Sequence, residues 1–311
     1  MALQILLLLV GLALIVFGAD WLVDGASAIA RKAGISEFVI GLTIVGFGTS
    51  CPELVVSLTG AIQGNADISV GNVIGSNIFN TMLILGMTAV IAPVAVTQSN
   101  RRRDIPITLL VTFLFVAMAL TGQKISFYEG LAFLMVFIAY MIYCFKSDQG
   151  LSGETAEEKI KNIWLAIALV LAGLAGLIFG GQLFVNNATA IARALGVSDK
   201  FIALTLLAGG TSFPELATCI VAAAKKKDQL ALGNILGSNI FNILLILGTS
   251  AVVIPISTFA LTWMDLGALM LSIVLLWLWT YTGHRDRVDR WEAIVMLAAF
   301  IAYYFWLFMK L

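Results

Sequence analysis

Long apolar runs separated by short polar stretches make up most of this chain. A run of about 20 apolar residues is long enough to cross the hydrocarbon core of a bilayer as a helix. Such runs occur at ten places, roughly 2–30, 38–62, 69–93, 105–122, 127–145, 162–192, 200–224, 231–254, 264–283 and 291–309. The pattern predicts an all-α polytopic membrane protein with ten transmembrane helices. The first and sixth runs are too long for a perpendicular span, so we expect those two helices to be tilted or partly interfacial.

The second half of the chain repeats the first half at a constant offset of 162 residues. Of the 69 positions between Gly18 and Gly86, about 31 carry the same residue as their partners one offset later. We therefore divide the chain into a first five-helix repeat at 1–145, a cytoplasmic linker at 146–161 and a second five-helix repeat at 162–311. Because five is an odd number, the second repeat enters the membrane from the opposite side. The sequence thus predicts two inverted five-helix repeats.

Composition agrees with a membrane protein and excludes other classes. The chain is 60% hydrophobic and 12% charged, with a mean hydropathy of +1.01, whereas soluble domains are about a quarter charged. The formal net charge is zero, so nothing indicates binding to nucleic acid. The three cysteines lie in or beside apolar runs without paired spacing. We interpret them as small buried side chains and expect no disulfide framework.

Lysine and arginine residues are distributed unevenly between the two sides of the predicted helices. One side receives fourteen of them, Arg31, Lys32, Arg101, Arg102, Arg103, Lys146, Lys159, Lys161, Lys225, Lys226, Lys227, Arg285, Arg287 and Arg290. The other side receives four, Lys124, Arg193, Lys200 and Lys310. Because basic loops tend to remain in the cytoplasm, we predict that the first side is cytoplasmic and that both termini lie outside.

Two polar motifs interrupt the apolar runs of each repeat. The first repeat contains Gly-Thr-Ser-Cys-Pro-Glu at 48–53 and Gly-Asn-Val-Ile-Gly-Ser-Asn-Ile-Phe-Asn at 71–80, and close copies return at 210–215 and 233–242. An ionisable side chain at membrane depth is costly and is usually retained for a function. We therefore interpret Glu53 and Glu215 as parts of one shared ion site. The alternative is a pair of structural carboxylates that neighbouring hydroxyls satisfy.

The motifs supply many oxygen atoms at membrane depth. Pro52 and Pro214 each remove a helical hydrogen bond, so we expect a kink that frees carbonyl oxygens in 46–49 and 208–211. Thr49 and Ser50 precede Glu53 by four and three residues, which places their hydroxyls on its face. Each repeat thus offers a carboxylate, hydroxyls, an amide and carbonyls. An all-oxygen set with two negative charges suits a hard cation such as Ca²⁺, and the lack of histidine in these motifs disfavours softer metals.

Other residues of the second motif receive structural interpretations. Gly71, Gly75 and their counterparts are expected to permit close helix approach. Asn77 and Asn239 directly follow Ser76 and Ser238 and are expected to point away from the site. Asn72 and Asn234 are interpreted as residues that cap or pin the starts of their helices.

The paired motifs resemble the α-repeats of the cation/Ca²⁺ exchanger superfamily, the Na⁺/Ca²⁺ exchangers and their bacterial relatives. The resemblance covers essentially the whole chain. It implies antiport of Ca²⁺ against Na⁺ by alternating access through one midplane site, in a prokaryotic cell membrane. By position, the ligands of the family fall on Thr49, Ser50, Glu53, Ser76, Asn80, Thr211, Ser212, Glu215, Ser238 and Asn242.

One departure concerns Asn242, where some family members, including K⁺-dependent exchangers, have aspartate. The site here has one carboxylate fewer, which puts K⁺ cotransport in doubt. Two carboxylates balance one Ca²⁺, two Na⁺ or two protons equally well. We expect Ca²⁺ and Na⁺ as transported substrates, the lipid bilayer as the surroundings, and no cofactor, nucleic-acid partner or enzymatic activity. A monomer is compatible with the sequence.

Three other functions compete with Na⁺/Ca²⁺ exchange. Ca²⁺/H⁺ antiport uses the same architecture, because closely spaced glutamates can carry protons. A passive cation channel is less favoured, since inverted halves with broken midplane helices suit alternating access better than an open pore. An intramembrane hydrolase using Ser50 or Ser212 would need a base, and the predicted spans contain no histidine and no lysine except Lys200 at the edge of one span.

Overall fold

A computed structural model describes residues 1–64, 66–122, 124–147, 160, 162–196, 209–259, 261–284 and 286–310. Several predicted features lie outside these ranges. They are most of the linker at 146–161, the segment 197–208 at the start of the seventh predicted span, and the basic residues Lys159, Lys161, Lys200 and Arg285.

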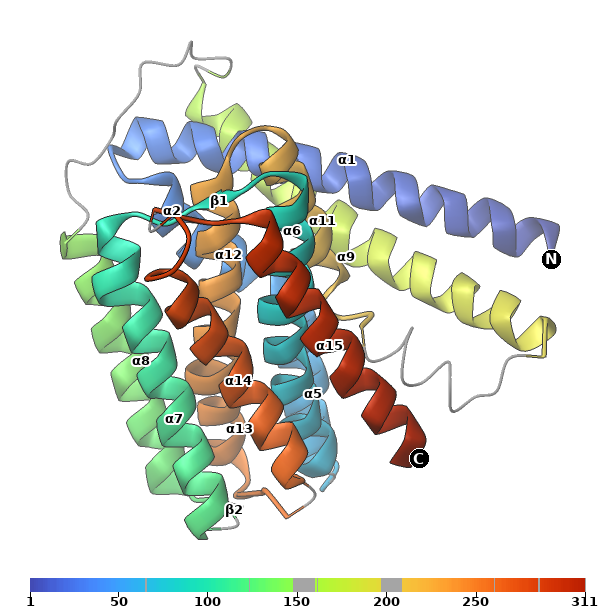
Figure 1. The fold of residues 1–311 in the computed structure, drawn as a ribbon. Helices are drawn as coiled ribbons and strands as arrows, with labels where there is room; N and C mark the ends of the chain where they lie inside the picture. The colour runs from blue at the N-terminus through green and yellow to red at the C-terminus, as the bar shows by residue number, and fades with distance from the viewer. Residues whose placement is uncertain are drawn as a thin grey trace.

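The described chain is mostly helical (Figure 1). The first half contains α1 (Ala2–Ala33), α2 (Glu37–Ile40), the π-helical segment η1 (Gly41–Val45), α3 (Gly46–Thr49), α4 (Cys51–Ile62), α5 (Ala66–Ile78), the π-helical segment η2 (Phe79–Ile84), α6 (Leu85–Ile91), β1 (Val94–Ala95), the π-helical segment η3 (Asn100–Asp104), α7 (Ile105–Gly122), β2 (Lys124–Ile125) and α8 (Phe127–Ser147). The second half contains α9 (Ile163–Ala194), α11 (Phe213–Ala224), α12 (Asp228–Ile240), the π-helical segment η5 (Phe241–Leu247), α13 (Gly248–Val253), β3 (Ile256–Ser257), α14 (Trp263–Trp279), β4 (Arg287–Val288) and α15 (Arg290–Lys310).

Many of these helices have the length and apolar character of membrane spans. In the described part, seven helices pass this test, and the bent segment from α2 to α4 makes an eighth. The helices α11 and α14 are apolar but shorter, with 12 and 17 residues. The structure therefore confirms a helical protein built for the membrane.

The two longest helices, α1 and α9, lie side by side and run obliquely across the other helices (Figure 1). Their backbones approach closely where glycines face each other. A Cβ atom on Gly18 would lie 2.8 Å from the carbonyl oxygen of Gly173, and one on Gly11 would lie 2.9 Å from that of Gly180. Small residues allow such contact between helices in a membrane. The tilt of these two helices relative to the bilayer stays a prediction.

Glycines also bring α12 against the first half of the chain. A Cβ atom on Gly233 would lie 2.2 Å from the carbonyl oxygen of Phe38, and one on Gly237 would lie 2.3 Å from that of Leu42. The predicted close approach is therefore confirmed for these two glycines. By the repeat offset, the segment expected to face Gly71 and Gly75 is 200–204, which lies outside the described residues.

Two short antiparallel sheets join the connections at opposite ends of the bundle (Figure 1). At one end Val94 of β1 pairs with Val288 of β4, and at the other end Lys124 of β2 pairs with Ser257 of β3. Each sheet links one loop of the first half to one loop of the second. Two loops predicted to be cytoplasmic therefore share one end, and two predicted to be external share the other.

Candidate functional site

Each Thr-Ser-x-Pro-Glu motif lies at the start of a helix, α4 in the first half and α11 in the second. Ser50 has φ −84° and ψ 5° between α3 and α4, and the two parts of this span bend by 47°. Ser212 has nearly the same conformation, φ −90° and ψ 5°, before α11. Pro52 and Pro214 then occupy the first turns of α4 and α11, where a missing N–H costs little. The predicted break is confirmed in the first motif. In the second motif, the described residues show a turn at 209–212 before α11, and the segment 197–208 lies outside the described ranges.

The two glutamates are buried, and each accepts a hydrogen bond from the opposite half. Glu53 and Glu215 are both 1% exposed. The hydroxyl of Ser212 donates to Oε1 of Glu53 at 3.2 Å, and that of Ser50 donates to Oε1 of Glu215 at 3.0 Å. Helical spacing predicted that each serine shares a face with the glutamate of its own motif. The hydrogen bonds cross between the halves, which the spacing within one motif does not indicate.

The serines of the second motifs join these crossed pairs. Ser50 Oγ lies 2.9 Å from Ser238 Oγ, and Ser212 Oγ lies 3.3 Å from Ser76 Oγ. Ser238 Oγ also lies 3.4 Å from Oε1 of Glu215. Both second-motif serines are buried. Glu215 therefore has the hydroxyls of Ser50 and Ser238 beside it, whereas Ser76 is linked to Glu53 through Ser212.

The threonines contact asparagines of the opposite half. Thr49 Oγ1 donates to Oδ1 of Asn234 at 3.1 Å, and Thr211 Oγ1 lies 3.5 Å from Oδ1 of Asn72. Both asparagines lie six residues inside their helices, which begin at Ala66 and Asp228. The prediction that they cap helix starts was therefore wrong.

The amide groups of these two asparagines also donate hydrogen bonds to residues of their own half. Asn72 Nδ2 donates to Ser57 Oγ at 2.9 Å and to the carbonyl oxygen of Glu53 at 3.2 Å. Asn234 Nδ2 donates to the sulfur of Cys219 at 3.3 Å. Ser57 and Cys219 are repeat partners. Cys219 is thus buried, as predicted, and also accepts a hydrogen bond behind the site.

The last residues of the second motifs present free oxygen atoms. Asn80 and Asn242 lie in the first turns of the π-helical segments η2 and η5. Their Oδ1 atoms are buried and have no hydrogen-bond partner, and the same is true of Oε2 of Glu53 and of Glu215 in the described structure. A buried acceptor without a partner costs about 1–3 kcal/mol. Four such oxygens, two from each half, have the chemistry of a ligand set for a hard cation.

The structure corrects the expected direction of Asn77 and Asn239. Both are buried. Asn242 Nδ2 donates to Oδ1 of Asn77 at 2.9 Å, and Asn80 Nδ2 donates to Oδ1 of Asn239 at 3.4 Å. These asparagines therefore contact the amides of the opposite half instead of pointing away. Their repetition in both motifs was the signal that the sequence interpretation did not use.

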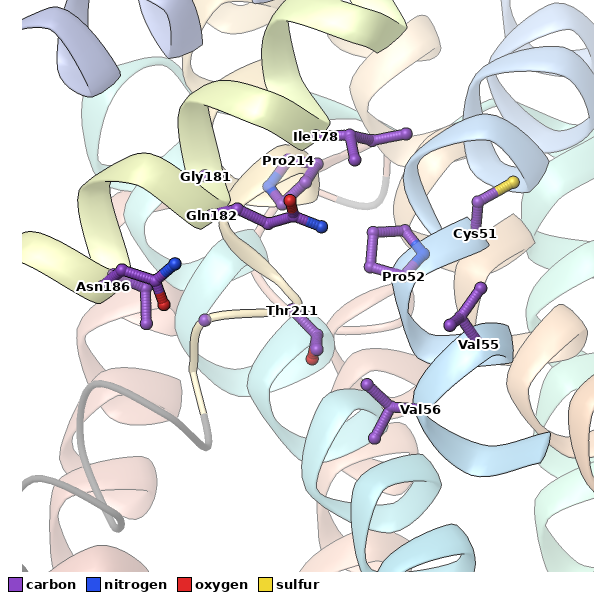
Figure 2. Close-up of a pocket in the computed structure, with 12 residues that line it drawn as sticks. Cys51, Pro52, Val55, Val56, Ile178, Gly181, Gln182, Asn186, Thr211 and Pro214 are labelled. Carbon is purple, nitrogen blue, oxygen red and sulfur yellow. The ribbon is translucent and has the colours of Figure 1, made fainter. Parts of the chain in front are cut away.

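A cavity of about 350 Å³ lies against the first motifs. Figure 2 shows Pro52, Val55 and Val56 of α4 on one side and Gln182 and Asn186 of α9 on the other, with Thr211 between them. The complete lining is Cys51, Pro52, Val55, Val56, Ile178, Gly181, Gln182, Val185, Asn186, Gly210, Thr211 and Pro214. The cavity thus leads to a predicted site residue, Thr211.

The repeat partners of Gln182 and Asn186 are engaged in ion pairs. These partners are Asp20 and Asp24 of α1. The ammonium group of Lys225 lies 2.7 Å from a carboxylate oxygen of each. Lys225 follows α11 directly, so the ion pairs connect α1 to α11. At the equivalent place in the first half, the chain has Gln63 instead of a lysine.

Hydroxyl and amide oxygens are essential to any metal site here. Within the described ranges, no group of three or more histidine, cysteine, aspartate or glutamate side chains could hold a metal ion. A cation between Glu53 and Glu215 would therefore rely on the serines, threonines and asparagines around them. This donor set favours a hard cation over a transition metal.

Comparisons with known proteins agree with this geometry. The family model described as sodium/calcium exchanger protein matches residues 3–146 and 165–309. The chain is 42% identical over 310 residues to the putative antiporter CaxA of Alkalimonas amylolytica, covering 96% of this chain and 97% of that protein. It is 33% identical over 338 residues to the sodium/calcium exchanger MaX1 of Methanosarcina acetivorans, covering 96% of each.

Among solved structures, the fold is similar to that of the sodium-calcium exchanger NCX_Mj soaked with Na⁺ and Sr²⁺. The TM-score is 0.85, the sequence identity is 32%, and the match covers 97% of both chains. In this site, the serine hydroxyl of each half donates to the glutamate of the other half. Together with a membrane fold matched along nearly its whole length, this arrangement identifies the class of transporter. This chain belongs to the sodium/calcium exchanger family of integral membrane antiporters.

Proposed function

We propose that this protein is a secondary antiporter that exchanges Ca²⁺ for Na⁺ across a prokaryotic cell membrane. The observation that carries the proposal is the set of four buried, unpartnered oxygens on Glu53, Glu215, Asn80 and Asn242. They come in equal number from the two halves, beside hydroxyls that already contact the carboxylates. The names of MaX1 and NCX_Mj as sodium/calcium exchangers support the same choice of ions.

The proposed ligands divide into two groups by charge. Glu53 and Glu215 supply the two negative charges that balance one Ca²⁺ or two Na⁺. The neutral oxygens come from Thr49, Ser50, Ser76, Asn80, Thr211, Ser212, Ser238 and Asn242. Ca²⁺ takes six to eight oxygen ligands, so this set is large enough for one Ca²⁺. Because the same atoms serve both ions, Ca²⁺ and Na⁺ compete, and competition at one site is the basis of exchange.

We further propose ten transmembrane helices in two inverted five-helix repeats, at 1–145 and 162–311, joined by the linker 146–161. The seven long helices, the bent span from α2 to α4, and the shorter α11 and α14 together account for this number. The proposed orientation has both termini outside. The antiparallel course of α1 and α9, seen in Figure 1, is consistent with inversion.

Access to the site would alternate between the two membrane faces. The cavity is lined by Gln182 and Asn186, in the part of α9 that the proposed topology places toward the outside. On the cytoplasmic side, Lys225 ties the equivalent residues Asp20 and Asp24 to α11. The described arrangement therefore suits a conformation open to the outside and closed to the cytoplasm.

Ion flux into proteoliposomes tests the proposal and separates its alternatives. Vesicles loaded with Na⁺ and diluted into Na⁺-free buffer with Ca²⁺ are expected to accumulate Ca²⁺, and a pH gradient alone is expected to drive no uptake. Uptake driven by the pH gradient without Na⁺ would identify the Ca²⁺/H⁺ antiporter instead. Ca²⁺ entry that follows only its own gradient, with no counter-ion on the other side, would indicate a channel.

A further inference from the structure

Four buried asparagines form crossed contacts between the two halves of the chain. Asn242 donates its amide N–H to Asn77 at 2.9 Å, and Asn80 donates its amide N–H to Asn239 at 3.4 Å. Within each half, the two asparagines are three residues apart, so they lie on one side of their helix. The helices α5 and α12 and the π-helical segments that continue them therefore meet through these amides.

The contacts determine which end of each ligand amide is free. A carboxamide has one accepting oxygen and one donating nitrogen, and only the oxygen can bind a cation. Because Nδ2 of Asn80 and of Asn242 is engaged across the interface, their Oδ1 atoms are left without a partner. A reversed amide would present N–H groups to the cation. The orientation of these two amides is thus a condition for binding.

A second layer of hydrogen bonds holds the orienting residues. Asn239 Nδ2 donates to Oγ1 of Thr81 at 2.7 Å. Asn77 Nδ2 donates to the carbonyl oxygen of Asn239 at 3.4 Å. Thr81 is buried, and its repeat partner is Ile243, which has no hydroxyl. The hydroxyl anchor therefore occurs in the first half alone.

We propose that Asn77 and Asn239 are positioning residues, which keep the amide oxygens of Asn242 and Asn80 directed at the transported cation and thereby set its affinity. Neither residue is itself a ligand, and each acts on the opposite half of the site. The inference rests on the proposed function, because it assumes that Asn80 and Asn242 bind the cation.

The test compares an amide with a carboxylate, because both ends of a carboxylate are oxygens and its orientation does not affect cation binding. Asn77→Leu removes the acceptor of Asn242 while keeping a similar volume, and we expect the Ca²⁺ KM of exchange to rise about tenfold. Asn242→Asp offers an oxygen in either orientation, and Asn77 can turn its own amide to donate to it. In the Asn242→Asp background, the same Asn77→Leu change is therefore expected to raise the KM less than about threefold. An equal cost in both backgrounds would mean a merely structural role and would overturn the proposal.

The equivalent test in the other half uses Asn239→Leu, alone and together with Asn80→Asp. The Ca²⁺ KM is again expected to rise with Asn239→Leu alone and to rise less in the Asn80→Asp background. If a leucine variant fails to fold, judged by gel filtration, Thr81→Val removes the anchor of Asn239 without touching a ligand. Its rise in KM should then disappear with Asn80→Asp, and persistence of the rise would contradict the proposal.

Calorimetric titration of Ca²⁺ into the purified variants measures the Kd where turnover is too slow for a KM. This measurement also separates the two hypotheses. Wild-type protein that binds Ca²⁺ but shows no Na⁺-driven uptake would contradict the exchange function. The Kd values of the variants would still decide whether Asn77 and Asn239 orient the amides.

Discussion

Ser50 and Glu215 are 165 residues apart in the chain, yet the hydroxyl of Ser50 donates to the carboxylate of Glu215 at 3.0 Å. Ser212 and Glu53 repeat the relationship at 3.2 Å. The charged group of each half is thus held by the hydroxyl of the other half, so neither half can form the site alone.

The first prediction concerns this crossed pairing. A hydrogen bond to a charged group contributes about 1.5–3 kcal/mol, so Ser50→Ala should lower Na⁺-driven Ca²⁺ uptake about tenfold. In a double-mutant cycle, Ser50→Ala should be strongly non-additive with Glu215→Gln and nearly additive with Glu53→Gln. Stronger coupling of Ser50 to Glu53 would refute the crossed arrangement.

The second prediction concerns the two glutamates. Glu53→Gln or Glu215→Gln removes one of two charges that face a divalent ion while keeping a similar shape. We expect each single variant to lose Ca²⁺ uptake about 100-fold or more, as for truncation of a buried charge pair, with no loss of folded protein. Glu129→Gln is the matched control, because Glu129 caps α8 by accepting from Ser126. Near wild-type exchange by either variant would remove the central claim.

The third prediction is that exchange needs no K⁺. Asn80 and Asn242 are both amides, so the site has one carboxylate from each half. Ca²⁺ uptake into Na⁺-loaded vesicles should therefore continue when choline replaces K⁺ on both sides. Asn242→Asp adds a third negative group, which should make exchange depend on K⁺ or on protons. If wild-type uptake stops without K⁺, the number of carboxylates in the site does not decide whether K⁺ is needed.

The fourth prediction concerns the contact between α1 and α9. A side chain at Gly18 would meet backbone atoms of Gly173 and Leu177 at 2.8 and 2.9 Å, and backbone cannot move aside as a side chain can. Overpacking typically costs about 1–3 kcal/mol, so Gly18→Leu should lower the melting temperature in detergent. Gly267→Leu, at an exposed position of α14, is the matched control. An unchanged melting temperature for Gly18→Leu would contradict the close packing.

The fifth prediction concerns orientation. Ala33 and Lys124 are both exposed, near the ends of the bundle that we assign to the cytoplasm and to the outside. In a background without Cys51, Cys144 and Cys219, a membrane-impermeant thiol reagent should label Lys124→Cys in intact cells. Ala33→Cys should be labelled only after the cells are opened. The reverse pattern would place both termini inside.

The sequence alone determined the features that depend on local composition and spacing. Apolar run length predicted the helices, because a span of the bilayer needs a set number of residues. The offset of 162 residues revealed the duplication, and Pro52 predicted the break at Ser50. Glu53 and Glu215 were identifiable as candidate site residues because charge at membrane depth is rare.

Only the tertiary structure decided which half each side chain contacts. Helical periodicity tells which residues share a face, as with Ser50 and Glu53, but it carries no information about the helix that lies opposite. The crossing of the two halves places Ser50 against Glu215 and Asn77 against Asn242. The sequence therefore predicted wrongly that Asn77 points away from the site, because its hydrogen-bond partner lies 165 residues away.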